Sequence, residues 1–319
     1  MKTKIIEIIK QSKKVAIFGH QSPDGDCLGS MYAISFLCKK FDKQVDMFVD
    51  DEISFPYTFL NIPNFNKCEF DVNNYDLLIS TDVAAKHLLG KYGNAFEGFK
   101  NTIVIDHHGA RDLVGSLTYV EQTPSCAEIV FDILKHSKVE IEPDVATFLY
   151  MGVSDDTGCF KHDNTTANTH KIAGELIDFG ADYKTINYNL FKLKPLKSFN
   201  MTNTLNQHIV SQDGLTYNYV TLDFMTKNGY TSHDLGDYVN TLVNLEGTKI
   251  AFLIVEKQKN VYRINFRSIE GYDVSKIANK FNGGGHSQAS GGSIIGKFKP
   301  SLKAVVDECM LALGENNVW

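Results

Sequence analysis

Four apolar segments in the first half of the chain run directly into aspartate or histidine. The clearest is Ile103–Ile105, which is followed by Asp106-His107-His108, and the others lead to His20, Asp82 and Asp156. Short apolar runs that alternate with helical patterns are typical of buried parallel strands. In an open α/β sheet the carboxyl ends of the strands border the ligand crevice. We therefore expect these polar side chains to meet at one edge of a parallel sheet.

The alternation of strand and helix patterns extends over residues 1–182 and then stops. It predicts an α/β domain with a mostly parallel sheet and helices on both faces. Residues 183–208 are predicted to form a helical linker that Pro195 interrupts, and residues 209–319 a smaller α+β domain. In this second domain the patterns indicate strands at 217–222, 250–255 and 261–267, and helices at about 233–246, 273–281 and 301–313.

The composition is that of a globular protein without a large nucleic-acid surface. The net charge is −6, so a broad, sequence-independent contact with a nucleic-acid backbone is not expected. The six cysteines form no Cys-x-x-Cys pair, and no apolar run approaches the ~20 residues that span a bilayer. With no signal-peptide pattern at the start, these features predict a cytoplasmic protein with reduced thiols and no membrane partner.

The segment His20-x3-Asp24-x-Asp26 places three metal-ligand side chains at one strand-to-helix turn. Imidazole nitrogen beside carboxylate oxygen suits Mn²⁺ or another first-row divalent ion better than Mg²⁺. The alternative is that Asp24 only caps the helix and His20 is an ordinary loop residue. However, carboxylates and imidazoles gathered from four segment ends would repel one another or lie unpaired unless a cation lay between them. The pattern therefore favours a cluster of two divalent ions, and hence a metal-dependent phosphoesterase.

The same residues resemble the DHH phosphoesterase superfamily, which is named for its Asp-His-His triplet. Its four N-terminal motifs have counterparts in Gly19–Asp26, the strand-end Asp82, Asp106-His107-His108 and Asp156-Thr157-Gly158. Asp155 is the rival of Asp156, and the Asp-Thr-Gly triplet of the family favours Asp156. The chain departs from the family after Asp82, where it has Val83-Ala84-Ala85 and relatives often have a small hydroxyl residue.

This resemblance implies a set of ligands for two divalent metal ions. One ion would be held by His20, Asp24 and Asp82. The other would be held by Asp26, Asp82, His107 and Asp156, so that Asp82 bridges the two ions. Mn²⁺ is the preferred metal in this expectation, with Mg²⁺ or Co²⁺ as alternatives.

A second distinctive segment, Asn282–Gly292, contains three consecutive glycines followed by His286. The backbone amides of Gly283, Gly284 and Gly285 are expected to form a nest for an anionic oxygen. The alternative is a flexible turn between the helix at 273–281 and a following strand. Upstream, Arg263 and Arg267 lie four apart on a predicted strand and so share a face. Because arginine suits bidentate phosphate recognition, these six residues are predicted to bind the substrate.

This part of the chain resembles the DHH-associated C-terminal domain, in which a Gly-Gly-Gly-His motif binds the substrate. The pattern is matched in order by Phe266-Arg267-Ser268, Asp273-Val274-Ser275 and Gly283–His286. Residues 1–182 would then be the catalytic, metal-binding domain and residues 209–319 the substrate-binding domain. The two resemblances cover nearly the whole chain. Within the superfamily the chain most resembles the NrnA-type members, which are bifunctional nanoRNases and 3′-phosphoadenosine 5′-phosphate (pAp) phosphatases.

The resemblance implies hydrolysis of short oligoribonucleotides to mononucleotides, of pAp to AMP, or of both, by a two-metal mechanism. The expected catalytic residues are the bridging Asp82, Asp106 as the partner that orients an imidazole, and His108 facing the substrate phosphate. Two alternatives remain open: a phosphodiesterase for cyclic or linear dinucleotides (c-di-AMP or pApA), and a non-catalytic nucleotide- or RNA-binding module. The expected partners are short single-stranded RNA or phosphorylated nucleotides, and a homodimer is left open.

Overall fold

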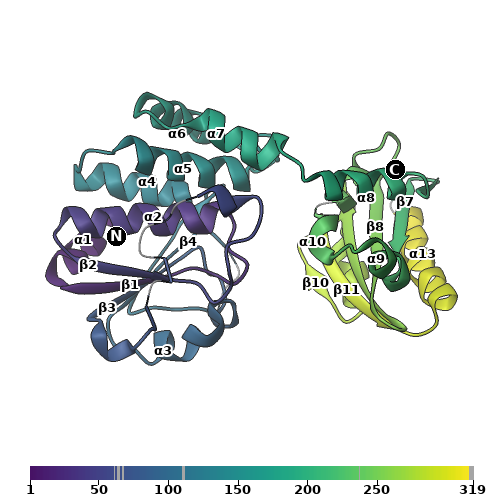
Figure 1. Ribbon diagram of the computed structural model, residues 1–319, viewed down its shortest axis with the longest axis horizontal. Helices are drawn as coiled ribbons and strands as arrows, with labels where there is room; N and C mark the ends of the chain where they lie inside the picture. Colours follow the sequence, from purple (N-terminus) through teal and green to yellow (C-terminus); the bar gives the residue numbers. More distant parts are fainter. Residues whose placement is uncertain (61, 63–64, 67, 110–111, 237, 316–319) are drawn as a thin grey trace. The chain divides into compact units, whose positions relative to one another are not determined.

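The computed structural model describes residues 1–60, 62, 65–66, 68–109, 112–236 and 238–315 (Figure 1). The chain divides into two compact units, Met1–Leu193 and Lys194–Trp319. The division falls inside the segment 183–208, which the sequence predicts to be a helical linker. None of the described helices has the length and apolar character needed to cross a lipid bilayer.

The core of the first unit is a parallel sheet. Among the described residues its strand order is β2-β1-β3-β4-β5, and every neighbouring pair is parallel. The strands are β1 (Lys14–Phe18), β2 (Gln44–Phe48), β3 (Leu77–Thr81), β4 (Thr102–Asp106) and β5 (Leu117–Val120). The order reverses between β1 and β3, so the carboxyl ends of these two strands border the topological switch point where open α/β sheets bind ligands. His20 follows β1 there and Asp82 follows β3.

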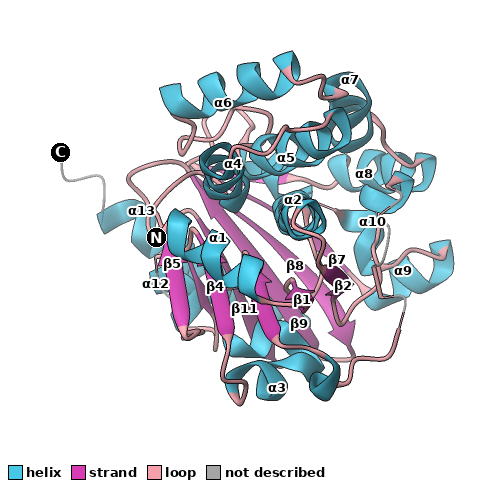
Figure 2. Ribbon diagram, turned by 90° about the vertical axis from the view of Figure 1, so that its left-hand side faces the viewer, coloured by secondary structure: helices cyan, strands magenta, loops and turns pink. Residues whose placement is uncertain are grey.

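Helices cover both faces of this sheet (Figure 1, Figure 2). On one face α2, α4 and α5 pack against Val15 and Ile17, and on the other η3 and α3 pack against Ala16 and Phe18. The helices of this unit are α1 (Lys2–Gln11), α2 (Gly25–Lys40), α3 (Gly93–Glu97), α4 (Cys126–Ser137), α5 (Pro143–Asp156), α6 (Ala167–Asp178) and α7 (Tyr183–Asn187). Short 3₁₀ turns occur at η1 (Tyr57–Phe59), η2 (Val72–Asn74) and η3 (Lys86–Tyr92), and a π-helical turn at η4 (Tyr188–Lys192). The predicted α/β class is confirmed.

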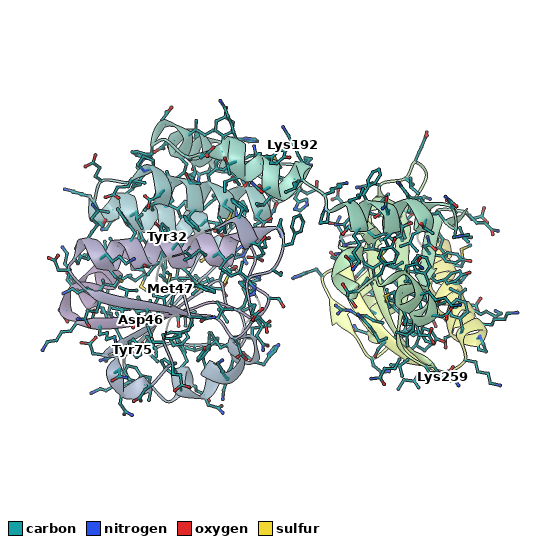
Figure 3. All side chains as sticks on the ribbon, in the orientation of Figure 1. Tyr32, Asp46, Met47, Tyr75, Lys192 and Lys259 are labelled. Atoms are coloured by element: carbon teal, nitrogen blue, oxygen red, sulfur yellow. The ribbon has the colours of Figure 1, made fainter. Side chains whose placement is uncertain are left out.

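Helices α2 and α5 approach each other closely because glycine lies at their contact. A Cβ on Gly29 would lie 2.3 Å from the carbonyl oxygen of Phe148 in α5, and a Cβ on Gly152 of α5 would lie 2.8 Å from Oδ1 of Asp26 in α2. One turn along α2, the ring of Tyr32 stacks on Phe148 with ring centroids 3.9 Å apart (Tyr32 is labelled in Figure 3). This contact fixes where α2 begins relative to where α5 ends, and both helix ends carry predicted metal ligands.

We expect Gly29→Ala to lower the free energy of unfolding by about 1–3 kcal/mol, because the added methyl group forces α2 and α5 apart. Gly174→Ala in α6 is the matched control, since nothing lies within 4 Å of the position its Cβ would take. Alanine there is expected to raise helix stability by up to about 1 kcal/mol. Urea unfolding of both variants measures the difference, and equal effects would contradict a close contact at Gly29.

The second unit is built on a mixed sheet. Among the described residues its strand order is β10-β11-β9-β8-β7-β6, with β7 and β8 parallel and the other pairs antiparallel. The strands are β6 (Val210–Gln212), β7 (Leu215–Val220), β8 (Ile250–Gln258), β9 (Val261–Ser268), β10 (Gly284–Gly285) and β11 (Ala289–Ile295). This arrangement confirms the predicted α+β character of the second part of the chain.

The helices of the second unit also pack on two faces. α12 and α13 pack on the face that carries Phe252 and Phe266, and α11 packs on the opposite face, against Leu253. The helices are α8 (Leu196–Asn206), α9 (Leu222–Asn228), α10 (Ser232–Leu235), α11 (Tyr238–Val243), α12 (Val274–Asn279) and α13 (Phe298–Glu315).

Two sequence predictions in this unit are wrong in detail. The strand predicted at 217–222 ends at Val220, because the Thr221 side chain accepts a hydrogen bond from the amide of Phe224 and so caps α9. The single helix predicted at 233–246 is two shorter ones, α10 and α11, and residue 237 between them lies outside the described residues.

Candidate metal centre

The six predicted metal ligands meet at the carboxyl ends of β1, β3 and β4. Potential ligand atoms form two groups, each with its atoms within 4.8 Å of one another: His20, Asp24 and Asp82, and Asp26, His107 and Asp156. A third group of the same kind contains Asp82, Asp106, His107 and His108. Asp82 therefore lies at the centre of the cluster, where the topology of the sheet places the switch point.

His20 is oriented by the backbone so that one ring nitrogen faces carboxylates. Its Nδ1 lies 2.8 Å from the carbonyl oxygen of Gln21 and donates to it, because a carbonyl oxygen only accepts. Nε2 is consequently directed at Asp24 Oδ1 and Asp82 Oδ2, each 3.6 Å away. Burial alone would lower the pKa of His20, but the Cys27 thiol and the two carboxylates together raise it above the usual value. Nε2 therefore faces two carboxylate oxygens, an arrangement that favours a cation between them.

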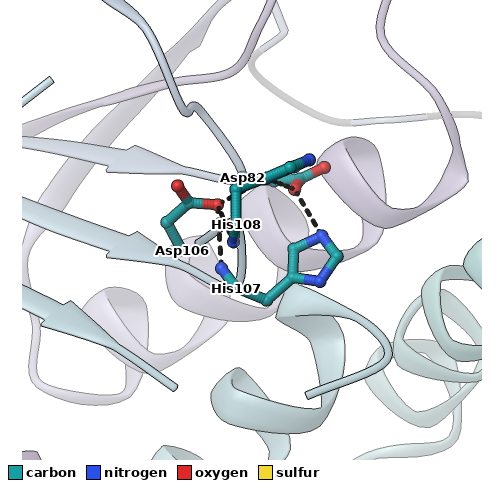
Figure 4. A group of neighbouring side chains, drawn as sticks. All are labelled: Asp82, Asp106, His107 and His108. Atoms are coloured by element: carbon teal, nitrogen blue, oxygen red, sulfur yellow. Dashed lines mark hydrogen bonds and ion pairs between the residues drawn. The ribbon is translucent and has the colours of Figure 1, made fainter. Parts of the chain in front are cut away.

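His107 repeats this arrangement on the other side of Asp82. Its Nδ1 donates to the carbonyl oxygen of Thr123 at 3.0 Å. Its Nε2 lies 3.4 Å from Asp82 Oδ1 (Figure 4). The same nitrogen lies 3.3 Å from Asp156 Oδ2 and 3.9 Å from Asp26 Oδ2. Burial opposes the charged ring, but the surrounding carboxylates raise the pKa of His107 to about 10. Metal-binding histidines commonly have one ring nitrogen fixed by such a hydrogen bond.

The carboxylates are buried and repel one another. Asp26 is fully buried and Asp82 nearly so. Burial, followed by the charge of Asp82, raises the pKa of both Asp26 and Asp156 well above the usual range. Burial also acts to raise the pKa of Asp82, but its contacts with His107 and His20 hold it below the usual range. The repulsion would be relieved by cations placed between these groups.

Unsatisfied polar atoms provide a test of whether this site fits metal ions. Asp82 Oδ1, Asp106 Oδ2 and His107 Nε2 are buried and have no hydrogen-bond partner among the described residues. Buried polar atoms without partners are costly unless an ion or water binds them. In addition, Asp156 is the last residue of α5, where the negative end of the helix dipole favours a cation. The residues present therefore fit divalent ions held by mixed nitrogen and oxygen ligands.

Two of the aspartates also hold helix ends in place. Asp24 caps α2 by accepting a hydrogen bond from the Cys27 amide at 2.9 Å, so the alternative role for Asp24 is real and coexists with its place in the cluster. Asp26 accepts hydrogen bonds from the amides of Cys126 and Ala127, at 2.6 and 2.8 Å. These amides begin α4, so Asp26 joins the start of α2 to the start of α4.

Asp106 organises the histidine pair rather than binding in the middle of the cluster. It is fully buried, and its Oδ1 accepts from the amides of His107 and His108 at 2.8 and 3.2 Å. The same oxygen lies 2.8 Å from His108 Nδ1 (Figure 4). The imidazole that Asp106 orients is therefore that of His108. The His108 side chain is 39% exposed, which leaves its ring accessible beside the cluster.

The structure separates the two rivals Asp155 and Asp156. Asp156 belongs to the group with Asp26 and His107. Asp155 Oδ2 instead accepts hydrogen bonds from the amide of Gly25 at 2.7 Å and from the hydroxyl of Tyr57 at 2.6 Å. Burial and the adjacent Asp155 raise the pKa of Tyr57, so its hydroxyl keeps its proton and donates.

This contact fixes the loop that carries two metal ligands, because Gly25 lies between Asp24 and Asp26. A Cβ at Gly25 would lie 2.6 Å from Asp155 Oδ2, which explains why glycine is required there. Tyr57 could not be identified as a site residue from the sequence, because it lies 98 residues from Asp155 in a segment with no distinctive pattern. Gly25 is visible in the sequence between two predicted ligands, Asp24 and Asp26, but its partner Asp155 could not be identified from spacing.

In the second unit, the predicted arginines lie on one face of β9. Arg263 and Arg267 both line the same cavity, together with Asn265 between them. Arg267 donates from Nε to Asn240 Oδ1 at 2.8 Å and from Nη1 to the carbonyl oxygen of Phe266 at 2.9 Å. These bonds hold the guanidinium group in a fixed orientation.

The three glycines lie beside and within the short strand β10, and the Gly283 amide is already bonded within the protein. The amide of Gly283 donates to the Ala278 carbonyl at 3.1 Å, and that of His286 to the Ala289 carbonyl at 2.9 Å. Gly284 and Gly285 pair with Gly291 and Ser290 of β11. A Cβ on Gly283 would lie 1.9 Å from the carbonyl oxygen of Gly291, so glycine is needed there for packing. His286 itself is exposed.

Comparison with known proteins assigns both units to one family. A model of the N-terminal domain of the DHH family matches residues 14–153, and a model of the DHHA1 domain matches residues 213–312. A Mycoplasma genitalium protein named bifunctional oligoribonuclease and PAP phosphatase NrnA is 30% identical over 97% of this chain and 96% of its own length. The chain belongs to the DHH family. As a DHH phosphoesterase it is a hydrolase.

Other proteins resemble this DHH protein over most of its length. The Bacillus subtilis protein of the same name is 27% identical over 92% of this chain and 93% of its own. A Listeria monocytogenes cyclic-di-AMP phosphodiesterase, PdeA, is 26% identical over 88% of this chain, which spans 44% of that protein. An exopolyphosphatase-related protein from Bacteroides fragilis shares the fold, with a TM-score of 0.90, 19% identity and coverage of 99% of this chain and 97% of that one.

We expect Tyr57→Phe to weaken Mn²⁺ binding by the DHH protein roughly tenfold, because the loop that carries Asp24 and Asp26 loses a support outside the ligands themselves. Tyr32→Phe is the matched control, since Tyr32 also donates to a carboxylate, Asp144 Oδ2 at 2.6 Å, on the surface. Calorimetric titration with Mn²⁺ measures both affinities, alongside melting temperatures. Equal losses of affinity in the two variants would contradict a specific role for Tyr57.

Proposed function

We propose that this DHH protein hydrolyses short oligoribonucleotides to mononucleotides, pAp to AMP, or both, at a centre of two divalent metal ions. One observation carries the proposal: each oxygen of Asp82 faces a different histidine, with Oδ2 3.6 Å from His20 Nε2 and Oδ1 3.4 Å from His107 Nε2. A carboxylate placed in this way has one oxygen available for each of two ions. The proposal also draws on the relatives named oligoribonuclease and PAP phosphatase.

The proposed ligands follow the two groups of side chains around Asp82. One ion would be held by His20, Asp24 and Asp82, and the other by Asp26, His107 and Asp156. Asp82 would also join the second set, since its Oδ1 lies 3.4 Å from His107 Nε2. The mixture of imidazole nitrogen and carboxylate oxygen favours Mn²⁺, with Co²⁺ or Mg²⁺ as alternatives. We also propose a cytoplasmic location, because the six cysteines are free thiols.

The side chains beside the candidate metal cluster have proposed roles in stabilising charge and in positioning other groups. When bound, two divalent ions lower the pKa of a water molecule and neutralise charge on the phosphoryl oxygens. His108, whose Nδ1 is held by Asp106, would direct Nε2 at a phosphoryl oxygen, and with both ring nitrogens protonated it would donate to that oxygen as negative charge develops there. Asp106 would act as a positioning residue, because it holds the ring of His108 and the amides of both histidines through one oxygen.

The residues proposed to bind the rest of the substrate belong to the second unit. Arg263 and Arg267 supply two guanidinium groups on one face of β9, which suits the bidentate recognition of phosphate. His286 and the Gly283–Gly285 hairpin add an exposed ring and close access to the backbone. A cyclic or linear dinucleotide is the second candidate substrate, and the similarity to the Listeria phosphodiesterase favours it. A non-catalytic binder is not proposed, because every ligand of the expected set is present.

Asp82→Asn tests the bridging role with the least change to the backbone. Asp82 has a φ of 59°, a conformation that asparagine adopts more readily than alanine. We expect the variant to lose turnover by several orders of magnitude, because a neutral amide cannot bridge two cations. Release of mononucleotides from 5′-phosphorylated RNAs of two to five nucleotides, of AMP from pAp, and of products from a cyclic dinucleotide would be measured with Mn²⁺.

Asp132→Asn is the control for this substitution, since Asp132 lies on the surface in an ion pair with Lys2. Near-normal turnover by Asp82→Asn would show that Asp82 does not bridge. Fast turnover of the cyclic or linear dinucleotide alone would replace the main proposal by the second candidate. Folding of each variant would be checked by its melting temperature.

Arg267→Ala tests the proposed substrate contact. We expect KM for short RNA to rise about tenfold or more while kcat changes little, because Arg267 would bind the phosphate of the ground state and the transition state alike. Steady-state kinetics on a dinucleotide and on pAp measure the two constants. A loss confined to kcat at saturating substrate would contradict this role.

A further inference from the structure

A cavity of about 530 Å³ lies in the first unit and contains none of the predicted site residues. Its lining comes from η2, from Tyr75 before β3, from α3 and from the residues after α3 up to Phe99. Among the described residues that line it, none carries a charge. Pockets for small molecules occupy roughly 300–1,000 Å³, so this cavity, called the distal cavity below, has the size for an uncharged small molecule.

The distal cavity lies at the amino end of β3, whereas the candidate metal cluster lies at the carboxyl ends of the strands. Tyr75 precedes β3, and Asp82 follows the same strand seven positions later. At about 3.3 Å per residue of a strand, the two places are roughly 20 Å apart. A small molecule in the distal cavity therefore does not reach the candidate metal ligands.

Tyr75 forms a rigid part of the lining. Its hydroxyl donates to Asp46 Oδ2 at 2.9 Å, and its ring stacks on Phe70 with ring centroids 5.6 Å apart (Tyr75 and Asp46 are labelled in Figure 3). Lys14 Nζ lies 4.9 Å from the centroid of the same ring and 3.4 Å from Asp46 Oδ2. Because this side of the cavity is already ordered, a ligand would lose little affinity to the cost of ordering it.

Small residues on the opposite side keep the distal cavity open. Gly98 has φ −78° and ψ −6°, which any residue can adopt. A Cβ on Gly98 would meet only the carbonyl oxygen of Asn94 within 4 Å, at an ordinary contact distance of 3.4 Å. Neither the backbone nor the packing requires glycine here, in contrast to Gly29. The missing side chain instead leaves space beside the half-buried Phe99.

Two carboxamides and an aromatic ring give this space its chemistry. Asn73 Nδ2 donates to Asp71 Oδ1 at 2.9 Å, so this carboxamide is held by its own segment. Asn94, in α3, is exposed and lines the other side of the cavity. A carboxamide binds adenine through N6 and N7 together, whereas guanine and cytosine are read mainly by charged side chains. Aromatic rings such as Phe99 are surfaces on which bases stack.

We propose that the distal cavity binds an adenine base, which stacks on Phe99 while the Asn94 carboxamide binds its N6 and N7. The ligand is recognised by its base rather than by a phosphate, because the described lining has no cationic side chain. This site goes beyond the proposed function: it is separate from the candidate metal cluster and needs no metal ion. Adenosine is the simplest probe of it.

Gly98→Leu in the full chain tests whether the distal cavity is the binding site. We expect the Kd for adenosine to rise roughly tenfold or more, because the leucine side chain would occupy part of the space of the base. Gly174→Leu in α6 is the matched control and should bind like the wild type, since nothing lies within 4 Å of its Cβ position and it does not line the cavity. Calorimetric titration with EDTA present measures the Kd values, and melting temperatures check the folding of each variant.

Asn94→Ala tests how the base is recognised. The wild type should bind adenosine about tenfold more tightly than purine riboside, which lacks the N6 amino group. Asn94→Ala should lose this preference and bind the two nucleosides alike. The inference would be overturned by an absence of adenosine binding to the wild type, by equal Kd values in Gly98→Leu and Gly174→Leu, or by an unchanged preference in Asn94→Ala.

Discussion

Electrostatic repulsion among buried carboxylates is the constraint on which the first unit depends. Asp26 and Asp82 are removed from water, and both lie close to the ring of His107. Such a group is unfavourable by itself, so the surrounding backbone must hold it together. It does so through amides that donate to Asp26 and Asp106 and carbonyls that fix His20 and His107. The result is a rigid arrangement of candidate ligand atoms, and cations bound between them would relieve their repulsion.

Two helices keep the candidate metal cluster rigid. The start of α2 and the end of α5 both lie beside it. α2 begins beside it with acidic residues in the first turn, and α5 ends beside it at Asp156. Both arrangements agree with the helix dipole, which favours anions at helix starts and cations at helix ends. The close contact at Gly29 and the hydrogen bonds of Asp155 hold the two ends in register. The packing of α2 on α5 and the positions of the candidate metal ligands thus depend on these same contacts.

The second unit presents charge of the opposite sign. Its sheet gathers Lys257, Arg263 and Arg267 around one small cavity, although the chain as a whole has a net charge of −6. The acidic total therefore does not exclude a nucleotide substrate, because the aspartates of the candidate metal cluster belong to the first unit and this cationic cavity to the second. A phosphate chain requires both kinds of site, cations bound by carboxylates and cationic side chains.

The sequence by itself determined the parallel sheet, the mixed second unit and the gathering of the metal-ligand side chains from His20 to Asp156, because these follow from apolar periodicity and from motifs local to strand ends. Tertiary structure decided the contacts between separate elements, which the periodicity of a sequence does not predict. Tyr57 reaches Asp155 across 98 residues, and the Gly283 amide donates to Ala278 near the end of α12. A bulge in β8 brings Lys257 to the cavity that Arg263 and Arg267 line. Each of these depends on the distance between atoms of separate elements, which is fixed only when helices and strands pack against one another.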